Sequence, residues 1–424
     1  MTEKLLQYIW QFQYFNKTAL TTVDGETLQI IYPGYLNNNQ GPDFLEAKIK
    51  VGDTNWAGNI ELHMLSSDWH AHKHSDDKNY KNIILHVVWL EDNDMELPFP
   101  VLELQNRISK FLLSRYDELM SAATFIPCEK SIHQVELLIW KSWKDRLLAE
   151  RLQNKASVIF DHLAINKNHW EETFWWLIAN NFGIKVNSDA FEKIARSLPL
   201  NILAKHKNQI QQVEALLFGQ AGLLNNNFTE AYPQMLQKEY AFYKVKYKLQ
   251  PVTIPLFFLR MRPANFPTVR LAQLAILIHQ SVNLFSIIKE AKTLKEIKEL
   301  LNVTANDYWH YHYILDEASA FREKRLGSQM VNNILINTII PIVFAFGLYH
   351  KNEMYKNKAL QWLEQVAAEK NNITNAFASL KTENKNAFDS QALIQLKNEY
   401  CNKKRCLECA VGNRLLKTVI ANYT

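Results

Sequence analysis

The spacing of apolar residues changes once along this chain, and this change constrains the fold more than any other feature. Up to about residue 105, short apolar runs are separated by turn signals such as Asp24-Gly25 and Gly52-Asp53. Runs of this kind are typical of strands joined by hairpins. From Val135 to the C-terminal end, apolar residues recur at helical spacing and hairpin signals nearly vanish. The sequence therefore predicts an N-terminal unit that contains a sheet, followed by a large, mainly α-helical region.

The first unit is expected to run in the order helix, strands, helix. The expected elements are a helix at 3–15, strands at 19–23, 27–32, 44–51, 55–64, 82–90 and 100–104, and a helix near 108–120. The run 82–90 is continuously apolar, as in a strand that is buried on both faces. We expect an α/β domain at residues 1–125, with a mixed sheet and flanking helices. A helical domain is expected at 126–424, with any subdivision near 225–255; its run 252–259 fits a helix or a strand.

Composition supports a folded protein of more than one domain. The 424 residues are 47% hydrophobic and 21% charged, and the formal net charge of +5 permits a polyanionic partner without requiring one. The first residues lack the pattern of a secretory signal. The apolar stretch 331–349 carries three asparagines and a proline, which favours a buried helix over a membrane span. We expect a cytoplasmic protein with no membrane partner and with reduced cysteines.

The dipeptide Pro42-Asp43 and the tripeptide Glu61-Leu62-His63 lie in the two strands of one expected hairpin. Carboxylates are hard oxygen ligands for Mg²⁺ or Mn²⁺, and an imidazole can position or deprotonate an attacking water. The sequence therefore predicts Asp43 and Glu61 as metal ligands and His63 as their catalytic partner in phosphodiester hydrolysis. The alternative is an ordinary turn followed by an amphipathic strand.

The register of this hairpin decides whether the two carboxylates meet. A two-residue turn at Gly52-Asp53 places Asp43 opposite Leu62, on the other face of the sheet from Glu61. A one-residue bulge, or a bend just after Pro42, would return Asp43 to the face of Glu61, and bulges are common beside active sites. We expect the bulge, with Glu46 as a reserve ligand.

The order of helix, hairpin, Pro42-Asp43, Glu61-Leu62-His63 and buried strand resembles the PD-(D/E)XK nuclease superfamily over roughly residues 1–120. The resemblance implies that Asp43 and Glu61 hold the metal and that Glu3 adds an acidic ligand. It also implies that His63 stands where the superfamily usually has a lysine. Neutral histidine carries little charge at neutral pH. An active variant, a nuclease with altered metal preference and a non-catalytic scaffold therefore all stay open.

Further histidines follow this motif. His70, His72 and His74 alternate along the chain among aspartates, and in an extended segment they could bind a transition metal. A polar surface loop is the favoured interpretation. His86 lies within the expected buried strand and is interpreted as a hydrogen-bonded core histidine.

The chain has four cysteines. Cys401, Cys406 and Cys409 have the spacing C-x4-C-x2-C, and Cys128 lies just after the α/β unit. Four thiols are the number required by Zn²⁺ or by a 4Fe–4S cluster, and either would clasp the C-terminal end to the first unit. The arrangement resembles the iron–sulfur staple of some nucleases of the same superfamily, with different spacing. The alternative is four unrelated cysteines.

Arginines gather in the loop 260–270. Arg260, Arg262 and Arg270, next to a helix N-terminus, are candidates for gripping the phosphates of a nucleic acid. The alternative is a rigid interdomain loop whose arginines pair with acidic neighbours. A second basic spot precedes Gly327 and consists of Arg322, Lys324 and Arg325.

Motifs along nearly the whole chain resemble an uncharacterised bacterial family, domain of unknown function 2851. They are the opening 3–12, Gly41-Pro42-Asp43-Phe44, Ile60-Glu61-Leu62-His63, Asp68-Trp69-His70, the Arg-Pro-Ala-Asn-Phe-Pro loop and 404–409. Membership of this family implies no established activity. The leading hypothesis is a Mg²⁺- or Mn²⁺-dependent nuclease that acts on DNA or RNA. The alternatives are a non-catalytic nucleic-acid-binding or scaffolding protein on a degenerate nuclease fold, and a metal-stapled structural protein.

Overall fold

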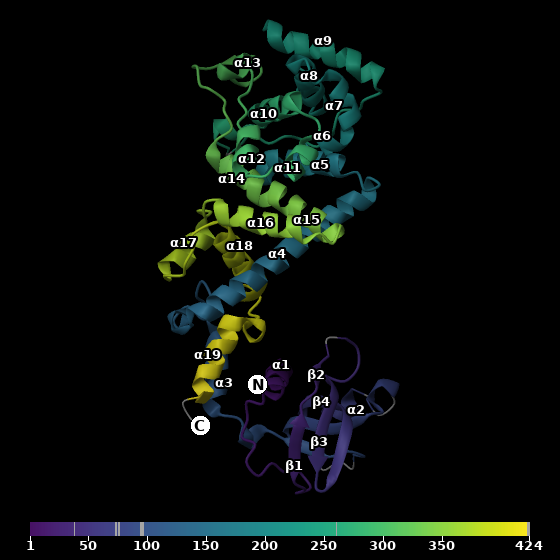
Figure 1. Ribbon diagram of the computed structural model, residues 1–424, viewed down its shortest axis with the longest axis vertical. Helices are drawn as coiled ribbons and strands as arrows, with labels where there is room; N and C mark the ends of the chain where they lie inside the picture. Colours follow the sequence, from purple (N-terminus) through teal and green to yellow (C-terminus); the bar gives the residue numbers. More distant parts are fainter. Residues whose placement is uncertain (38, 73, 75–76, 94–96, 260, 422–424) are drawn as a thin grey trace. The chain divides into compact units, whose positions relative to one another are not determined.

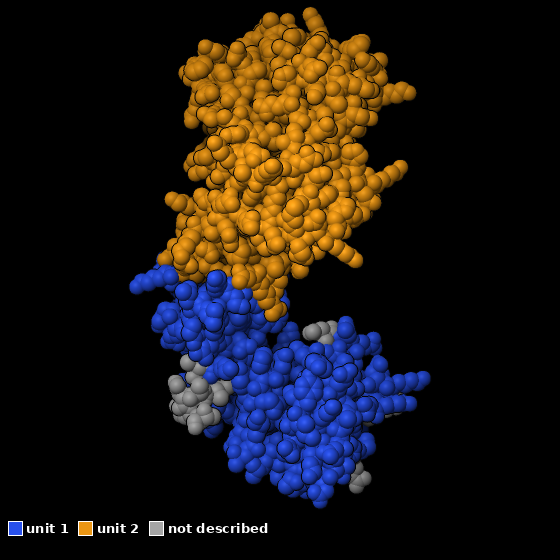
Figure 2. Space-filling model, in the orientation of Figure 1, with its two compact units in different colours: residues 1–143, 379–381, 396–424 blue, residues 144–378, 382–395 orange. Residues whose placement is uncertain are grey.

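The structure is a computed structural model that describes residues 1–37, 39–72, 74, 77–93, 97–259 and 261–421. Figure 1 shows the fold and labels many of its helices and strands. The chain divides into two compact units, which Figure 2 shows in different colours. Unit 1 comprises residues 1–143, 379–381 and 396–424, and unit 2 comprises residues 144–378 and 382–395. The C-terminal segment thus belongs to the same unit as the N-terminal sheet.

Unit 1 is built on a mixed sheet of six strands, as the sequence predicts. Strand order is β1-β3-β4-β5-β6, with β2 paired to β3; β1, β3 and β4 are antiparallel neighbours, while β4, β5 and β6 are parallel. The strands are β1 (Leu28–Tyr32), β2 (Tyr35–Leu36), β3 (Phe44–Val51), β4 (Thr54–Leu65), β5 (Ile83–Leu90) and β6 (Val101–Glu103). The first six residues of β5 are buried, in agreement with its continuously apolar sequence. The expected strand at 19–23 is reduced to one bridge, between Thr21 and Thr27.

Helix α1 (Glu3–Phe12) packs against β4. It begins at Thr2, whose hydroxyl accepts a hydrogen bond from the amide of Leu5. It ends three residues earlier than expected because Gln13 adopts a left-handed conformation, with φ of 54°. The helix buries one face against the sheet. Glu3 and Gln7 lie outside that face in its first two turns, near the ends of the central strands.

The remaining helices of unit 1 come from both ends of the chain. They are α2 (Asp68–Ala71), η2 (Lys78–Tyr80), η3 (Gln105–Arg107), α3 (Lys110–Ser121), η4 (Ile132–Gln134), the first turns of α4 (Leu137–Ile165), η7 (Leu396–Cys401), η8 (Cys406–Glu408) and α19 (Ala410–Ala421). Helix α19 packs on α3, η4 and η8. The hydroxyl of Tyr8 in α1 donates a hydrogen bond to Oδ1 of Asn413 in α19, 3.0 Å away.

Unit 2 is helical apart from one short hairpin, as expected from its apolar spacing. Its elements are the rest of α4, α5 (Trp170–Phe182), α6 (Ile184–Ser197), α7 (Leu200–His206), α8 (Ile210–Gln220), α9 (Ala231–Lys246), η5 (Pro263–Asn265), α10 (Pro267–Gln280), α11 (Leu284–Glu290), α12 (Leu294–Leu300), α13 (Asp307–His310), β7 (His312–Ile314), β8 (Glu317–Ala318), α14 (Ser328–Ile334), η6 (Leu335–Ile339), α15 (Ile340–Tyr349), α16 (Glu353–Gln365), α17 (Asn372–Ser379, whose last residue is counted with unit 1) and α18 (Ala387–Gln395). The run 252–259 forms neither a helix nor a strand. That expectation was wrong, and the run instead packs two of its apolar side chains on the core of unit 2.

One helical stretch in the described part of the chain, Ser328–Tyr349, is long and apolar enough to cross a membrane. Of its most apolar window, 72% is buried inside the protein. It contributes Ile334, Ile339 and Ile340 to the core of unit 2, which is the role that its asparagines and proline favour.

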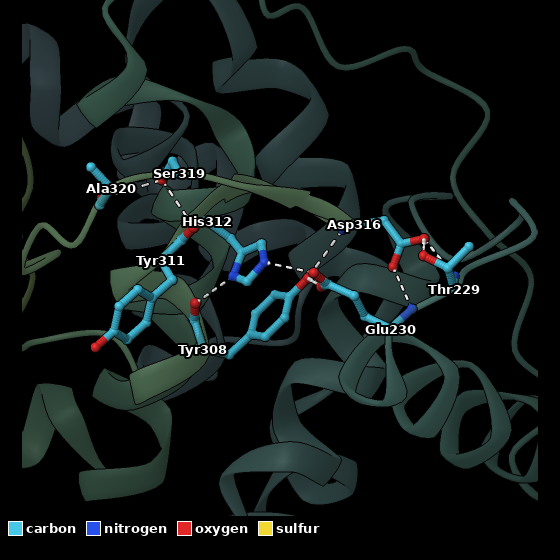
Figure 3. Close-up of polar contacts among 8 residues, drawn as sticks. All are labelled: Thr229, Glu230, Tyr308, Tyr311, His312, Asp316, Ser319 and Ala320. Atoms are coloured by element: carbon cyan, nitrogen blue, oxygen red, sulfur yellow. Dashed lines mark hydrogen bonds and ion pairs between the residues drawn. The ribbon is translucent and has the colours of Figure 1, made fainter.

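A polar network holds the β7–β8 hairpin against the start of α9 (Figure 3). Nε2 of His312 lies 3.1 Å from Oε1 of Glu230, and Nδ1 lies 2.8 Å from the carbonyl oxygen of Tyr308. The hydroxyl of Tyr308 donates to the other oxygen of Glu230 at 2.7 Å, and Asp316 accepts from the amides of Thr229 and Glu230. Because both ring nitrogens of His312 have protein partners, this network is a structural clamp.

Candidate metal centre

A β-bulge in β3 positions the first candidate ligand. Phe44 pairs with Ile60 and Ala47 pairs with Gly58, so two residues of β3, Leu45 and Glu46, lie opposite the single residue between those partners. Glu46 takes the strained left-handed conformation that such a bulge demands, with φ of 58°. The bulge predicted from the sequence is therefore confirmed, and it shifts the register by the one residue that Asp43 needs.

The bulge brings Asp43 and Glu61 together across β3 and β4. The amide of Asp43 donates a hydrogen bond to Oε2 of Glu61 at 3.0 Å, and the amide of Leu62 donates to Oδ2 of Asp43 at 3.1 Å. Each carboxylate is thus fixed by a backbone donor from the other strand. The predicted convergence of these two acids is what the structure shows.

Helix α1 adds a third acid and an amide to this pair. Nε2 of Gln7 donates to Oδ1 of Asp43 at 2.8 Å and to Oε1 of Glu3 at 3.4 Å. Burial and the charge of Glu3 raise the pKa of Asp43, although hydrogen bonds from Leu62 and Gln7 oppose the shift. Burial and the charge of Asp43 raise the pKa of Glu61. Clustered buried acids repel one another and favour a bound cation.

Glu46, the reserve ligand, does not join this group. Its side chain is exposed, and its charge acts on Tyr32. Its amide instead donates to Oδ1 of Asn59 at 3.3 Å.

Four histidines lie beside the carboxylates. The ligand nitrogens of His63, His72 and His74 all lie within 4.8 Å of one another. His63 is the centre of the group: its Nε2 is 3.1 Å from Nδ1 of His72, and its Nδ1 is 2.8 Å from Nε2 of His86. His70, by contrast, is exposed in the short helix α2 and stays apart from this trio.

Glu61 joins the histidines to the acids. Its Oε1 lies 3.6 Å from Nε2 of His63 and 3.6 Å from Nε2 of His74. Burial and the neighbouring imidazoles lower the pKa of His63 to about 3, so this side chain is neutral at physiological pH. The interpretation of His86 as a hydrogen-bonded core histidine is confirmed, because it is fully buried and bonded to His63.

These donors fit a divalent cation. Asp43, Glu61 and Glu3 supply oxygen atoms of the kind that Mg²⁺ and Mn²⁺ prefer. His63, His72 and His74 supply neutral imidazole nitrogens, which suit transition metals. Nε2 of His74, 3.6 Å from Glu61, has no hydrogen-bond partner among the described residues.

A cavity of about 550 Å³ adjoins this centre and shares His74 with it. Its walls include the aromatic side chains of Trp56, Trp69, Tyr80 and Phe99. The ring of Tyr80 stacks on His74, with centroids 3.9 Å apart. Burial, together with the charges of Glu61 and Asp43, raises the pKa of Tyr80 to about 12. The aromatic cavity is therefore within electrostatic reach of the carboxylates.

The candidate phosphate-binding arginines have different surroundings. Arg260 lies outside the described residues, and Arg262 is exposed. Arg270 lies in the first turn of α10 and is only 6% exposed; it donates to Oε1 of Gln273 at 2.8 Å and to Oδ1 of Asn265 at 2.5 Å. Arg270 is therefore not part of an exposed phosphate-binding loop, because helix α10 places it in the interior of unit 2.

Arg270 lines a cavity of about 420 Å³ in unit 2. Arg322, Lys324 and Arg325 line the same cavity, so the two basic spots of the sequence meet there; Glu323 is the acidic side chain among its described lining residues. The partners of Arg270 are neutral amides, and its Nε has no hydrogen-bond partner among the described residues. Burial lowers its pKa to about 10.

The four cysteines all belong to unit 1 and are free thiols. Cys128, Cys406 and Cys409 are each 7% exposed, and Cys401 is half-buried.

Sequence reasoning missed the part that His72 and His74 play, because it favoured a surface loop for them. The segment is not extended, as binding had been expected to require: Asp68–Ala71 forms a helical turn, and the chain then brings both side chains back to His63. The signal in the sequence was the pair of histidines close after Glu61-Leu62-His63, but alternation along the chain was the wrong criterion for their convergence.

A family model with the description "Protein of unknown function (DUF2851)" matches residues 3–372. No curated protein matches the chain. No solved structure matches it either.

Proposed function

Since the chain belongs to the family of proteins of unknown function DUF2851, we propose a function from the chemistry of the site: unit 1 is a metal-dependent nuclease. The observation that carries the proposal is the bulge-dependent convergence of Asp43 and Glu61 beside His63. A buried and a half-buried carboxylate held by backbone amides, with a neutral imidazole 3.6 Å from Glu61, are the equipment that metal-assisted phosphodiester hydrolysis requires.

The topology of unit 1 supports the same proposal. A helix precedes an antiparallel hairpin that carries the two acids, and a buried parallel strand follows. This order is similar to that of the PD-(D/E)XK nucleases, and we propose a relationship to that superfamily. Topology is an analogy, however, so the activity rests on the site.

In the proposed mechanism, Asp43 and Glu61 hold the metal and Glu3 adds negative charge. Bound there, a divalent cation supplies a lowered pKa for a coordinated water and charge for the phosphate oxygens. His63 replaces the lysine of the superfamily. With a pKa of about 3 it is a weak base, and its Nε2 lies 3.1 Å from Nδ1 of His72 and 3.6 Å from Glu61, so in this mechanism it orients the attacking water rather than taking its proton. The adjoining imidazoles favour Mn²⁺ over Mg²⁺.

The aromatic cavity suggests the form of the substrate. Among the aromatic lining residues, Trp56 and Tyr80 are half-buried and could stack with a base, and the cavity of about 550 Å³ has the size of a small-ligand site. A base inside a duplex cannot stack on such side chains, whereas an unpaired base can. We therefore propose single-stranded nucleic acid, DNA or RNA, as the substrate.

The test is cleavage of labelled single-stranded and double-stranded DNA and RNA with Mg²⁺ or Mn²⁺. Wild type is expected to cleave single strands with Mn²⁺, and Glu61→Gln is expected to lose activity by roughly 100-fold or more. Glu46→Gln is the matched control, because it removes an exposed carboxylate of β3 that lies outside the site. Equal cleavage by wild type and Glu61→Gln would reject the proposal.

A second candidate function is nucleic-acid binding without cleavage, and the basic cavity of unit 2 favours it. A buried arginine with only amide partners is costly unless an anion reaches it, and Arg322 and Arg325 are exposed at the same cavity. The double variant Arg322→Gln/Arg325→Gln should weaken binding and flatten its dependence on salt, whereas Arg262→Gln, which changes an exposed arginine outside the cavity lining, should do so less. Binding that depends on Arg322 and Arg325, in a wild type without cleavage, would favour this second function over the first.

A further inference from the structure

The four cysteines come from two distant parts of the chain and meet in unit 1. Cys128 lies in the turn after α3, where the amide of Ser131 donates to its carbonyl oxygen at 3.0 Å. The other three lie about 270 residues later: Cys401 ends η7, Cys406 begins η8, and Cys409 directly precedes α19. Two lysines fix the C-terminal segment near Cys128, since Nζ of Lys397 donates to the carbonyl oxygen of Phe125 at 2.6 Å and Lys404 donates to that of Met120.

The elements that carry or adjoin the thiols pack on one another: η8 contacts η7 and α19, and α19 contacts η4, the short helix that follows Cys128. No disulfide joins the four cysteines, of which three are buried and Cys401 is half-buried. Burial, with a contribution from Cys409 and Cys406, raises the pKa of Cys128 to about 12. The four cysteines of the chain thus lie in elements that pack together.

The backbone around the thiols provides donors for negative sulfur. Burial raises the pKa of Cys409, and the backbone of Gly412 and Val411, in the first turn of α19, lowers it in part. Gly412 is required here: a Cβ at this position would lie 2.3 Å from the carbonyl oxygen of Cys406. A helix N-terminus and N–H groups aimed at sulfur stabilise a thiolate over a thiol.

Positive charge also surrounds the group. Lys404 acts on Cys406 and Lys397 acts on Cys401, lowering the pKa of each thiol against the effect of burial. A centre with four thiolate ligands carries net negative charge with either zinc or a four-iron cluster, and nearby lysines offset that charge.

We propose that Cys128, Cys401, Cys406 and Cys409 hold a metal centre with four thiolate ligands. Four thiolates suit either a zinc ion or an iron–sulfur cluster. The sulfur atoms on a single zinc ion lie about 3.8 Å apart, whereas the described ligand groups within 4.8 Å of one another include no set of thiols. We therefore favour the iron–sulfur cluster.

Such a centre closes unit 1. It ties the C-terminal segment 396–424 to the end of the N-terminal part of unit 1, after the chain has returned from unit 2. Closing this long loop lowers the conformational entropy of the unfolded chain and so stabilises the folded state. Asn413 follows Cys409 by four residues and accepts from Tyr8 of α1, the helix whose Gln7 bonds to Asp43. The proposal does not rest on the nuclease activity, but loss of the metal would loosen α19 against α1.

The experiment is elemental and sulfide analysis of full-length protein purified without oxygen, together with its visible absorption spectrum. Four iron atoms with matching acid-labile sulfide per chain, and a broad visible band, are expected. One zinc per chain with no visible band would support the four-thiolate centre in its zinc form. Wild type without zinc or iron, even after expression in supplemented medium and anaerobic reconstitution, would overturn the proposal.

Variants test the ligands. Cys128→Ser and Cys406→Ser should each lose most of the metal, while Lys403→Ala, an exposed change between the cysteines, should retain it. If the serine variants fail to fold, alkylation of the wild-type protein tests whether the four thiols are bound to metal. All four thiols should resist a thiol reagent until a chelator is added and then react together. Reaction at the same rate with and without chelator would contradict the proposal.

Discussion

The amide of Asp43 donates a hydrogen bond to Oε2 of Glu61, and the two side chains share one face of the sheet only because β3 contains a bulge. Without the bulge, Asp43 would pair with Leu62 and point away from Glu61. One extra residue in one strand therefore decides whether the two carboxylates converge.

The bulge can be tested at Glu46. Replacement by Gly keeps the bulge and relieves the left-handed conformation, so we expect Glu46→Gly to raise the free energy of unfolding by up to about 1 kcal/mol. Deletion of Glu46 restores regular pairing and should abolish Mn²⁺ binding, measured by calorimetry. Mn²⁺ binding of wild-type strength in the deletion variant, shown by circular dichroism to be folded, would contradict the role of the bulge.

Glu61→Gln should separate stability from function. Burial and the charge of Glu3 raise the pKa of Asp43 to about 7, and burial and the charge of Asp43 raise that of Glu61 to about 8. Glu61 is therefore charged only above a pH of about 8, where its replacement relieves repulsion in the metal-free protein. Above that pH we expect a higher melting temperature than wild type without metal, together with loss of the stabilisation that Mn²⁺ gives wild type. Glu46→Gln, the control, should keep the stabilisation by Mn²⁺. A Glu61→Gln variant that Mn²⁺ stabilises as strongly as wild type would show that the ion binds elsewhere.

Much of the fold could be predicted from the sequence, because strands and helices follow local apolar spacing. The hairpin of β3 and β4, the buried strand β5 and the helical character of unit 2 all follow from that spacing. The bulge was predictable as well, since only a shifted register brings Asp43 to Glu61. The end of α1 was not, because it depends on the left-handed conformation of Gln13.

The candidate site was predictable only where strands carry it. His72 and His74 lie at the end of the short helix α2 and just beyond it, and no periodic signal in the sequence predicts that they reach His63. The interior position of Arg270 depends on how α10 packs inside unit 2, and the sequence could not distinguish this packing from an exposed loop. The local pattern of apolar residues determines the secondary structure, but the positions of these side chains depend on tertiary packing.

A buried acid in unit 2 was also missed. Glu214 lies in the apolar helix α8 and is fully buried. Its oxygens accept hydrogen bonds from Tyr232, Asn306 and Trp309, at 2.6 to 3.2 Å. A single glutamate in an apolar helix was the signal, although its partners lie far away in the sequence.

Glu214 should make the stability of unit 2 depend on pH. Burial raises its pKa from 4.5 to about 7, and the hydrogen bonds oppose part of that shift. A raised pKa in the folded state stabilises the protein fully below pH 4.5, and this contribution is lost as the pH rises through 7. The loss is on the order of 3 kcal/mol.

The measurement is chemical denaturation of wild type and Glu214→Gln between pH 4 and 8. Because other acids titrate in the same range, the difference between the two proteins is the informative quantity. The stability of wild type should fall relative to the variant as the pH rises. Parallel curves across this range would refute the prediction.

Replacement of Trp56 tests whether the aromatic cavity binds a base. Trp56→Ala removes a half-buried ring from the cavity wall, and loss of one stacked base costs about 1–3 kcal/mol. We expect roughly 5- to 100-fold weaker binding of single-stranded oligonucleotides by fluorescence anisotropy, with binding of Mn²⁺ unchanged. Phe111→Ala, an exposed aromatic change on α3, serves as the control and should bind like wild type. Equal affinities of all three proteins would exclude base stacking at Trp56.

The most direct test of the metal centre is anomalous diffraction at the manganese edge from crystals soaked in Mn²⁺. The account predicts a peak bounded by Asp43, Glu61 and His63, present in wild type and absent from Glu61→Gln. Crystals of wild type that show no anomalous peak at these three residues, at a concentration of Mn²⁺ that saturates any binding in solution, would contradict it.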